Sequence, residues 1–370
     1  MKTKVLFMIP TLMHGGAEKV LVNLVNNMDK SKYEITLFSI FDVGVNKEFL
    51  NPSVNYQFKY KNIFRGNTYY FNLFSPEVLY RKFIKEEYDV LVSYLEGPAT
   101  RIISGCTHPK TKKIAWFHIE ANDEKAAKVG FRSLKEARQY YNRFDQINAV
   151  SEMVKDKFVK AIQPKVPVDV LYNTNESDRI IELGKEAIDS AIFNAKINLI
   201  SAGKLESSKG FDRLLEVNKK LIDEGFEHSI SILGIGTEQK ILEKRIKELG
   251  VESSFKLLGF HKNPYRFIAK SDLYVCSSRR EGFSTAVTEA LILGIPVVST
   301  NCSGAKELLG NQNEYGIVTE NTTDGLYSGL MKLLSDPDKL SHYKKQALDR
   351  GAFFSKDKTV KAVENLFENL

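Results

Sequence analysis

The chain has 370 residues, of which 43% are hydrophobic and 27% charged, and its formal net charge is +7. This length exceeds what one hydrophobic core usually organises, so we expect two domains of a globular protein. No apolar run approaches the roughly 20 residues that span a bilayer, and the run Val5–Ile9 is too short for a signal-peptide core, which predicts a cytoplasmic protein.

The distribution of charge suggests what the two halves bind, and the cysteine spacing argues against a zinc site and a disulfide framework. Residues 1–172 carry 26 Lys and Arg against 18 Asp and Glu, whereas residues 173–370 carry 27 against 28. A basic first half beside a neutral second half suggests that the two halves have different partners. The three cysteines are far apart in the sequence and lack the spacing of a zinc site or a disulfide framework.

In chain order, short apolar runs alternate with helix-like segments. The first half has such runs at 4–9, 35–40, 90–94, 114–117, 147–150 and 168–171, and the second half has them at 197–202, 229–233, 255–258, 273–276 and 297–300. Continuous apolar strands separated by helices predict parallel sheets that are covered on both faces. We therefore predict an α/β protein with two Rossmann-like domains.

The domain boundaries follow from an interval without a strand. We place a first domain at 1–172, a linker region at 173–195 and a second domain at 196–355. The tail at about 356–370 has the apolar pattern of an amphipathic helix and can pack back on the first domain. Ligands are expected at the carboxyl ends of the strands.

The strongest local pattern lies between two second-half strands, at 280–298. Ser284 or Thr285 can cap a helix whose buried face carries Val287, and Gly294 suits the position just after its end. The loop therefore enters a helix N-terminus, where backbone N–H groups favour an anion such as a diphosphate.

Two carboxylates, Glu281 and Glu289, flank that anion site. A carboxylate beside a phosphate is unfavourable unless it accepts hydrogen bonds, and sugar and ribose hydroxyls can donate them. The alternative is that Glu281 caps a helix and Glu289 is a solvated helical residue.

The pattern resembles the E-x7-E signature of the retaining glycosyltransferases of family 4, the GT-B enzymes of bacterial polysaccharide synthesis, whose two Rossmann-like domains face each other across a cleft. The run Glu289-Ala290, Gly294 and Pro296-Val297 also matches that family. The resemblance implies that Glu281 approaches hydroxyls of the transferred sugar and that Glu289 holds the ribose. It assigns contacts with the sugar and the diphosphate to the backbone of four residues: Gly282, Phe283, Ser284 and Thr285.

A second match follows the strand at 197–202. Gly203 permits close approach, and Lys204 and Lys209 could grip a diphosphate and its developing charge. The family has an Arg where this sequence has Lys204, which keeps the charge but loses the bidentate fork. A lysine-bearing surface loop is the alternative. The family also meets the base near a later strand end, which implies Phe260.

The first domain supplies weaker matches. Gly15 and Gly16, which follow the first strand after His14, are implied to contact the diphosphate. His118 ends a later strand, where the family has a His near the donor sugar and acceptor, and a hydrogen-bonded core His is the alternative. Glu120 is an acceptor-side candidate. The resemblance thus gives catalytic roles to His118, Lys209 and Glu281.

No metal or other cofactor is predicted. Asp336-Pro337-Asp338 reads as the D-x-D of metal-dependent sugar transferases, but Asp-Pro is also a helix-start signal, which we prefer. The two lysines and the helix dipole can replace a cation on the diphosphate.

The acceptor is suggested by the charge of the first half. The segment 123–144 reads as a basic helix with Tyr140, Tyr141 and Phe144 as apolar anchors, and could dock on anionic lipid at the inner face of the cell membrane. A solvated helical face is the equal alternative. Nucleic acid would also suit a basic patch, but no binding motif for it accompanies this one.

These observations predict a metal-independent hexosyltransferase. It would take a nucleotide diphosphate sugar, a UDP-sugar before a GDP-sugar, and transfer to a lipid-linked or growing glycan. The alternatives are a nucleotide-sugar epimerase and a non-catalytic nucleotide-sugar-binding protein on the same fold. The sequence does not identify the base, the sugar or the acceptor.

Overall fold

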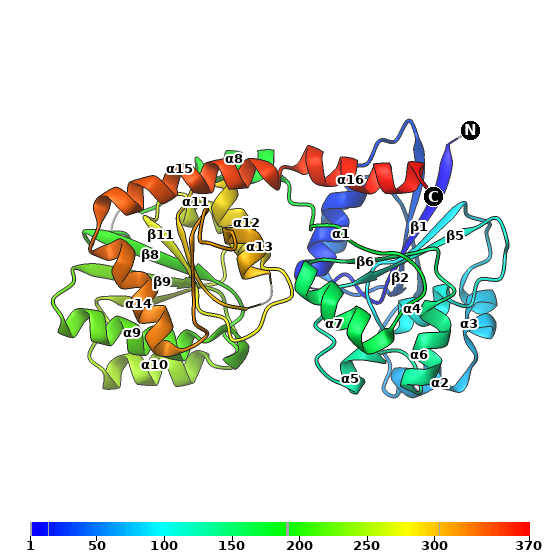
Figure 1. Cartoon of the computed structure of the whole chain (residues 1–370), viewed down its shortest axis with the longest axis horizontal. Helices are drawn as coiled ribbons and strands as arrows, with labels where there is room; N and C mark the ends of the chain where they lie inside the picture. Colours follow the sequence, from blue (N-terminus) through cyan, green and yellow to red (C-terminus); the bar gives the residue numbers. More distant parts are fainter. Residues whose placement is uncertain (1, 14, 190–191, 303) are drawn as a thin grey trace. The chain divides into compact units, whose positions relative to one another are not determined.

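The computed structural model describes residues 2–13, 15–189, 192–302 and 304–370. The chain forms two compact units, of which the first is Met1–Asn175 together with Lys356–Leu370 and the second is Glu176–Ser355. Each unit is a parallel sheet with helices on its faces, drawn in Figure 1. The prediction of two Rossmann-like α/β domains is therefore confirmed.

The first sheet has seven strands, and every pairing in it is parallel. In spatial order the strands are β3 (Asn55–Tyr60), β2 (Tyr33–Phe41), β1 (Thr3–Ile9), β4 (Val90–Ser93), β5 (Lys112–Phe117), β6 (Gln146–Ala149) and β7 (Val168–Val170). The strand order reverses between β1 and β4. This reversal places the carboxyl ends of β1 and β4 at the point where open α/β sheets bind ligands.

The second sheet repeats this plan with six parallel strands. In spatial order they are β10 (Phe255–Gly259), β9 (His228–Leu233), β8 (Ile197–Ala202), β11 (Leu273–Cys276), β12 (Val297–Thr300) and β13 (Ile317–Thr319). The order reverses between β8 and β11, where Leu273 pairs with Leu199. Loops that follow β8 and β11 therefore meet at one edge of this sheet.

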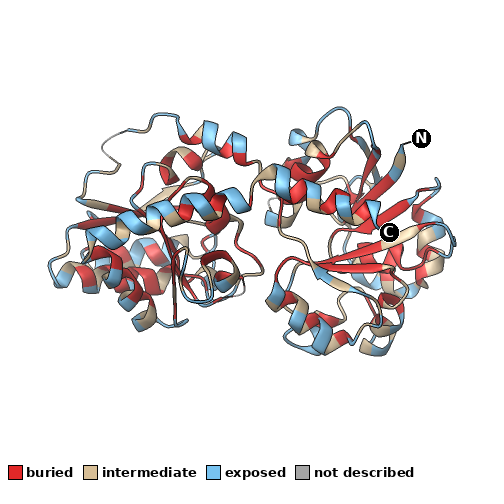
Figure 2. Ribbon diagram, turned by 45° about the horizontal axis from the view of Figure 1, so that its top comes forward, coloured by how far each residue is buried: buried red, intermediate tan, exposed pale blue. Residues whose placement is uncertain are grey.

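Helices cover both sheets, and their outer faces are exposed while the interior strands are buried (Figure 2). In the first unit they are α1 (Gly16–Asn27), η1 (Val45–Phe49), α2 (Asn67–Leu73), α3 (Pro76–Phe83), α4 (Pro98–Ile103), α5 (Glu124–Ala127), α6 (Leu134–Tyr141), α7 (Glu152–Ile162) and α16 (Lys356–Glu368). In the second unit they are α8 (Ser177–Gly184), η2 (Ser207–Lys209), α9 (Phe211–Asp223), α10 (Gln239–Glu248), α11 (Tyr265–Ile268), α12 (Thr285–Ile292), α13 (Ala305–Leu309), α14 (Thr323–Leu334) and α15 (Pro337–Phe353). Among the helices of the described residues, none has the length and apolarity to cross a bilayer.

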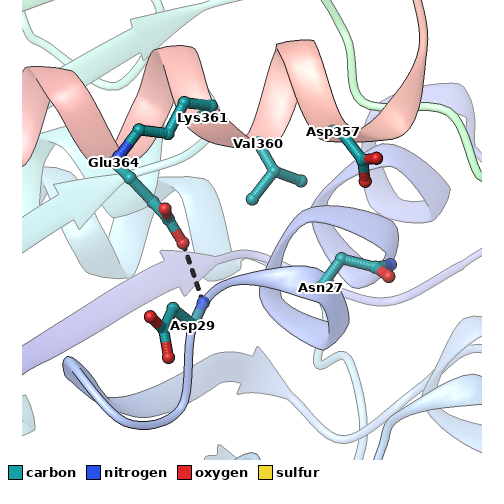
Figure 3. A pocket seen from close by; sticks show the side chains of 6 residues that line it. All are labelled: Asn27, Asp29, Asp357, Val360, Lys361 and Glu364. Carbon is teal, nitrogen blue, oxygen red and sulfur yellow. Dashed lines mark hydrogen bonds between the residues drawn. The ribbon is translucent and has the colours of Figure 1, made fainter.

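The last helix, α16, packs on the first unit. The Phe367 ring lies 6.1 Å from that of Phe7 and 5.9 Å from that of Tyr33. Glu364 accepts a hydrogen bond from the Asp29 backbone N–H at 2.8 Å, across a small pocket between the end of α1 and α16 (Figure 3). These contacts fix the final helix against β1 and β2, so the first unit is built from both ends of the chain.

The basic segment 123–144 differs from its prediction. It forms two short helices, α5 and α6, separated by a turn at Gly130, whose φ is 85°. Tyr140, Tyr141 and Phe144 are buried. The prediction that these aromatics form a membrane anchor is therefore wrong, because they belong to the core of the unit.

Candidate functional site

The loops after β8 and β11 carry the charged groups that the sequence singled out in the second unit. Lys209 ends η2, after β8, and Glu281 follows β11 by five residues. The Lys209 ammonium lies 2.5 Å from Oε1 of Glu281, which also accepts a hydrogen bond from the Ser278 hydroxyl at 2.7 Å. Glu281 therefore does not cap a helix, and that alternative is wrong.

The electrostatics of this pair favour its charged form. Burial alone would lower the pKa of the Lys209 ammonium, but the charge of the Glu281 carboxylate and the hydrogen bond to it outweigh burial and raise that pKa above its usual value. The side chains are only 26% and 13% exposed. The site thus holds a protonated lysine whose charge is balanced by one carboxylate.

Two arginines hold the loops of this site together. The buried Arg213 guanidinium donates to the Ser277 carbonyl from Nε at 2.9 Å and from Nη2 at 2.6 Å. Arg279 forms a bidentate pair with Asp212 at 2.7 and 2.8 Å, and also donates to the Ser207 carbonyl at 2.8 Å. Because the two loops are cross-linked in this way, the Lys209 and Glu281 side chains are held at a fixed separation.

Gly210 makes this close approach of the loops feasible. It adopts a left-handed conformation with φ 65°, and a Cβ built on it would lie 2.2 Å from the Ser277 carbonyl oxygen. The Ser277 hydroxyl in turn donates to the Lys209 carbonyl at 2.8 Å. A side chain at position 210 would therefore push apart the loops that carry Lys209 and Glu281.

The helix after Glu281 begins and ends as its sequence predicts. Ser284 is the N-cap of α12, and its hydroxyl accepts from the Val287 backbone N–H at 3.4 Å. Gly294 follows the helix with φ 72°. Gly282 precedes the cap, Phe283 is buried, and Thr285 is the first helical residue. The first amides of α12 have no acceptor within the helix, which suits them to an anion.

Glu289 is buried on α12 with 6% of its surface exposed. Its Oε1 accepts a hydrogen bond from the Tyr265 hydroxyl at 3.1 Å. The alternative that Glu289 is a solvated helical residue is therefore wrong. A buried carboxylate that is held by a neighbouring hydroxyl keeps a fixed direction, which suits it to a ligand hydroxyl.

Glycines let the loops after β8 and β9 approach one another. A Cβ at Gly203 would touch the Lys209 stem at 3.3 Å, and one at Gly234 would collide with the Gly203 carbonyl oxygen. Lys204 is exposed, and among the described residues its ammonium has no hydrogen-bond or ion-pair partner. Phe260, just beyond β10, is 59% exposed. Lys204 and Lys209 therefore differ, because only Lys209 is held by a carboxylate.

In the first unit, His118 follows β5 and is neutral. Burial lowers its pKa to about 3, against a hydrogen bond to the Tyr94 backbone that acts to raise it. Its Nε2 is buried without a hydrogen-bond partner among the described residues. The His118 backbone N–H donates to Glu96 at 2.9 Å, and burial raises the pKa of that carboxyl to about 7. His118 therefore keeps features of the alternative, a hydrogen-bonded core histidine, because it is buried and bonds to the Tyr94 backbone, while its Nε2 is left for a further partner.

The other candidates of the first unit, Glu120, Gly15 and Gly16, make contacts with residues of their own unit. The Glu120 carboxylate is engaged by Lys157 and by Asn122, so it is an ion-paired group at this position. Gly15 is the N-cap of α1 and Gly16 its first residue, and the Glu18 carboxylate folds over Gly15 so closely that a Cβ there would clash. His14 lies outside the described residues.

Asp336 caps a helix, as the sequence predicts. It is the N-cap of α15, and its carboxylate accepts from the Lys339 backbone N–H at 3.1 Å, with Pro337 at the first helical position. The carboxylate thus has a structural partner in the backbone.

Five residues that position these groups have no recognisable pattern around them in the sequence. They are Arg213, Tyr265, Ser277, Ser278 and Arg279. Ser277 and Ser278 come directly after β11, at the reversal point of the sheet, so their place at a strand end is a signal that could have found them. The arginines and Tyr265 gave no comparable signal.

Two family profiles match the chain. The profile described as "Glycosyltransferase Family 4" matches residues 14–179, and the one described as "Glycosyl transferases group 1" matches residues 185–350. The first match covers most of the first unit and four residues of the second, and the second match falls within the second unit.

Two glycosyltransferases are similar to this chain over most of its length. An N-acetylgalactosamine-N,N'-diacetylbacillosaminyl-diphospho-undecaprenol 4-alpha-N-acetylgalactosaminyltransferase of Campylobacter jejuni is 28% identical over 376 residues, covering 95% of this chain and 95% of the relative. An uncharacterized glycosyltransferase of Haemophilus influenzae is 27% identical over 334 residues, covering 88% of each.

Solved structures share the fold over the whole chain. Anabaena Alr3699/HepE in complex with UDP and glucose has a TM-score of 0.78 at 19% identity, with all of both chains covered. The apo form of the lipopolysaccharide outer core galactosyltransferase WaaB has a TM-score of 0.71 at 18% identity, again with all of both chains covered.

Proposed function

Since the chain belongs to the glycosyltransferases of group 1 and family 4, and is therefore an enzyme, we propose that it is a retaining hexosyltransferase that uses a nucleotide diphosphate sugar. The acceptor is the hydroxyl of a lipid-linked or growing glycan in bacterial cell-surface polysaccharide synthesis. The observation that carries this proposal is the Lys209–Glu281 pair at the reversal point of the second sheet.

The pair suggests how the donor binds. The diphosphate of the donor competes with Glu281 for the Lys209 ammonium, so binding transfers the lysine from the carboxylate to the phosphates. Glu281 is then available to accept hydrogen bonds from hydroxyls of the sugar, and Glu289 from those of the ribose. The exposed Lys204 adds a second positive charge, and the amides at the start of α12 add hydrogen bonds to the phosphates.

The same groups act on the transition state. As the bond from the sugar to the diphosphate breaks, negative charge grows on the leaving phosphate, and Lys209 with the α12 amides stabilises it without a metal ion. The acceptor hydroxyl attacks on the same face and gives its proton to the leaving phosphate oxygen. The neutral imidazole of His118 serves the acceptor side, where its buried Nε2, which has no partner among the described residues, can bond a hydroxyl of the acceptor.

Donor and acceptor classes are supported by the comparisons. Complexes with UDP and with UDP-glucose of a protein of the same fold favour a UDP-sugar here, with a GDP-sugar as the second choice. The Campylobacter relative carries a diphospho-undecaprenol acceptor in its name, which supports a lipid-linked acceptor. The basic first unit is consistent with peripheral contact at an anionic inner membrane face.

The test begins with the donor. Thermal-shift measurements against UDP-, GDP- and ADP-sugars should show stabilisation by one class, because binding raises stability with occupancy. Transfer is then measured with that donor and a set of lipid-linked and soluble acceptors, with and without EDTA, and the anomeric configuration of the product is read by NMR. An inverted product, a requirement for a metal, or transfer only to soluble small molecules would each contradict part of the proposal. Epimerisation of donor incubated alone would favour an epimerase instead.

A further inference from the structure

A solvent-exposed apolar pair stands out on α2 of the first unit. Tyr69 is 80% exposed and Leu73 74% exposed, and they are four residues apart, on one face of the helix. Ile63, in the segment that leads into the helix, is 48% exposed. Single exposed apolar side chains are ordinary, but two on successive turns of one helix face require an explanation.

The opposite face of α2 explains why this pair points outward. Phe71 is buried, and its ring lies 5.9 Å from that of Phe83 and 6.4 Å from that of Phe41. Tyr70 packs against Phe64 at 5.7 Å. One apolar face of α2 is therefore packed in the core. Tyr69 and Leu73 form a second apolar face, which is exposed.

Cations lie next to this second face, and the Glu136 carboxylate beside Arg132 is held by Arg101 at 3.1 Å. Residues 49–76 contain three Lys and Arg and no Asp or Glu. Arg65 is exposed just before α2, and exposed Arg132 donates to the Asn72 carbonyl at 2.6 Å, next to Leu73. Exposed Lys82 lies over the Phe74 ring at 4.2 Å. The nearest acidic residue along the chain, Glu77, is neutralised by Arg143 at 2.5 Å.

We propose that this α2 surface, formed by Ile63, Tyr69, Leu73, Arg65, Lys82 and Arg132, docks the protein on an anionic lipid bilayer. The aromatic and aliphatic tips enter the headgroup boundary, and the three cations contact lipid phosphates. The purpose of this docking rests on the proposed function, because a lipid-linked acceptor lies in that bilayer. The docking itself depends only on the residues of this α2 surface.

The test uses the full chain and two kinds of vesicle. Co-sedimentation is measured with phosphatidylcholine vesicles and with vesicles that also contain phosphatidylglycerol, at low and high salt. Wild type should bind only the anionic vesicles, and less at high salt. Tyr69→Ser/Leu73→Ser should weaken partitioning about tenfold or more, and Arg65→Glu should weaken it and reduce its salt dependence. The matched control, Ile241→Ser/Leu348→Ser, removes two exposed apolar side chains of the second unit and should bind as wild type does.

The outcomes separate docking from catalysis. Transfer to a short-chain, water-soluble acceptor analogue should be unchanged in Tyr69→Ser/Leu73→Ser, while transfer to acceptor in anionic vesicles falls. Failure of wild type to bind vesicles, or equal binding by all variants, would overturn the docking proposal. It would also be overturned if light scattering showed a wild-type dimer that this double variant dissolves, because the surface would then join two copies. Vesicle binding that needs α2, together with no transfer to any acceptor, would instead refute the proposed function alone.

Discussion

The Lys209 ammonium lies 2.5 Å from the Glu281 carboxylate, although the two residues are 72 positions apart in the chain. The arrangement is assembled by two loops that follow neighbouring strands and that Arg213 and Arg279 hold together. The charge of each partner is therefore balanced by the other in the ligand-free protein, and in the mechanism that we propose each gains a separate partner when a donor binds.

Replacing Lys209 by Ala should lower both stability and activity. The variant leaves the Glu281 carboxylate, which is 13% exposed, without its cation, so the melting temperature should fall. Transfer should fall about 100- to 1,000-fold, as for the loss of one group that stabilises transition-state charge. Lys204→Ala is the control, since Lys204 is exposed and its melting temperature should match that of wild type. Calorimetry measures the melting temperature, and release of nucleotide measures transfer. An equal fall in melting temperature in Lys209→Ala and Lys204→Ala would contradict the prediction that only Lys209 stabilises the fold.

Gly210→Ala should separate the loops of the site. A Cβ at Gly210 would lie 2.2 Å from the Ser277 carbonyl oxygen, so the loops must move in addition to the strain of the left-handed backbone. Gly225→Ala is a close match, because Gly225 also has positive φ but nothing within 4 Å of its Cβ. We expect Gly225→Ala to cost about 1 kcal/mol with full activity, and Gly210→Ala to cost more and to lose donor binding. Urea unfolding and thermal shift with donor compare the two variants. An equal loss of unfolding free energy in both would show that the loops accommodate the Cβ at position 210 without strain.

Tyr265→Phe should weaken donor binding more than it weakens the fold. It removes only the hydroxyl that donates to Glu289, a bond whose loss costs about 1 kcal/mol in stability. If Glu289 holds the ribose, the KM for donor should rise severalfold with a smaller change in kcat. Tyr327→Phe, which removes a hydroxyl bonded to exposed Glu224, is the control and should leave KM unchanged. A fall in kcat with constant KM would instead place Glu289 in the chemical step.

Glu96 should make stability fall as the pH rises. Burial raises its folded pKa to about 7, above the ordinary 4.5, so the folded chain binds more protons and this contribution is full in acid and lost as pH passes 7. The lowered pKa of His118 acts in the opposite direction, but only below its unfolded value of about 6.5. Between pH 6.5 and 8, wild type should therefore lose about 1 kcal/mol relative to Glu96→Gln. Urea unfolding across this range tests the prediction, with Glu252→Gln at an exposed position as the control. If the unfolding free energies of wild type and Glu96→Gln changed in parallel with pH, Glu96 would not be the cause of the loss.

The sequence predicted every strand of the two sheets except one edge strand of each, β3 and β13. Strands buried on both faces read as continuous apolar runs, whereas β3 at one edge is a half-exposed mixture that includes Gln57 and Lys59, and β13 has only three residues. Both were missed for that reason. The prediction of the fold class was still correct, because the interior strands and the helices between them are enough to specify a parallel sheet.

For the candidate site, local spacing predicted groups on one loop or helix, such as Glu281, Ser284 and Glu289. It could not predict contacts between loops. Arg213 reaches the Ser277 carbonyl across 64 residues, and a backbone acceptor has no signature in the sequence. The same limit explains Tyr140 and Tyr141, whose aromatic character fits a membrane anchor or a core equally well until their neighbours are known.

Because α16 completes the first unit, the second unit is in effect inserted into the first between Asn175 and Lys356. During synthesis, the second unit has all its residues before the helix that covers Phe7 and Tyr33 has left the ribosome. The first unit, although translated first, is therefore the last to finish folding. Residues 176–355 form the natural fragment for separate expression, whereas a fragment that ends at Asn175 would leave part of its core uncovered.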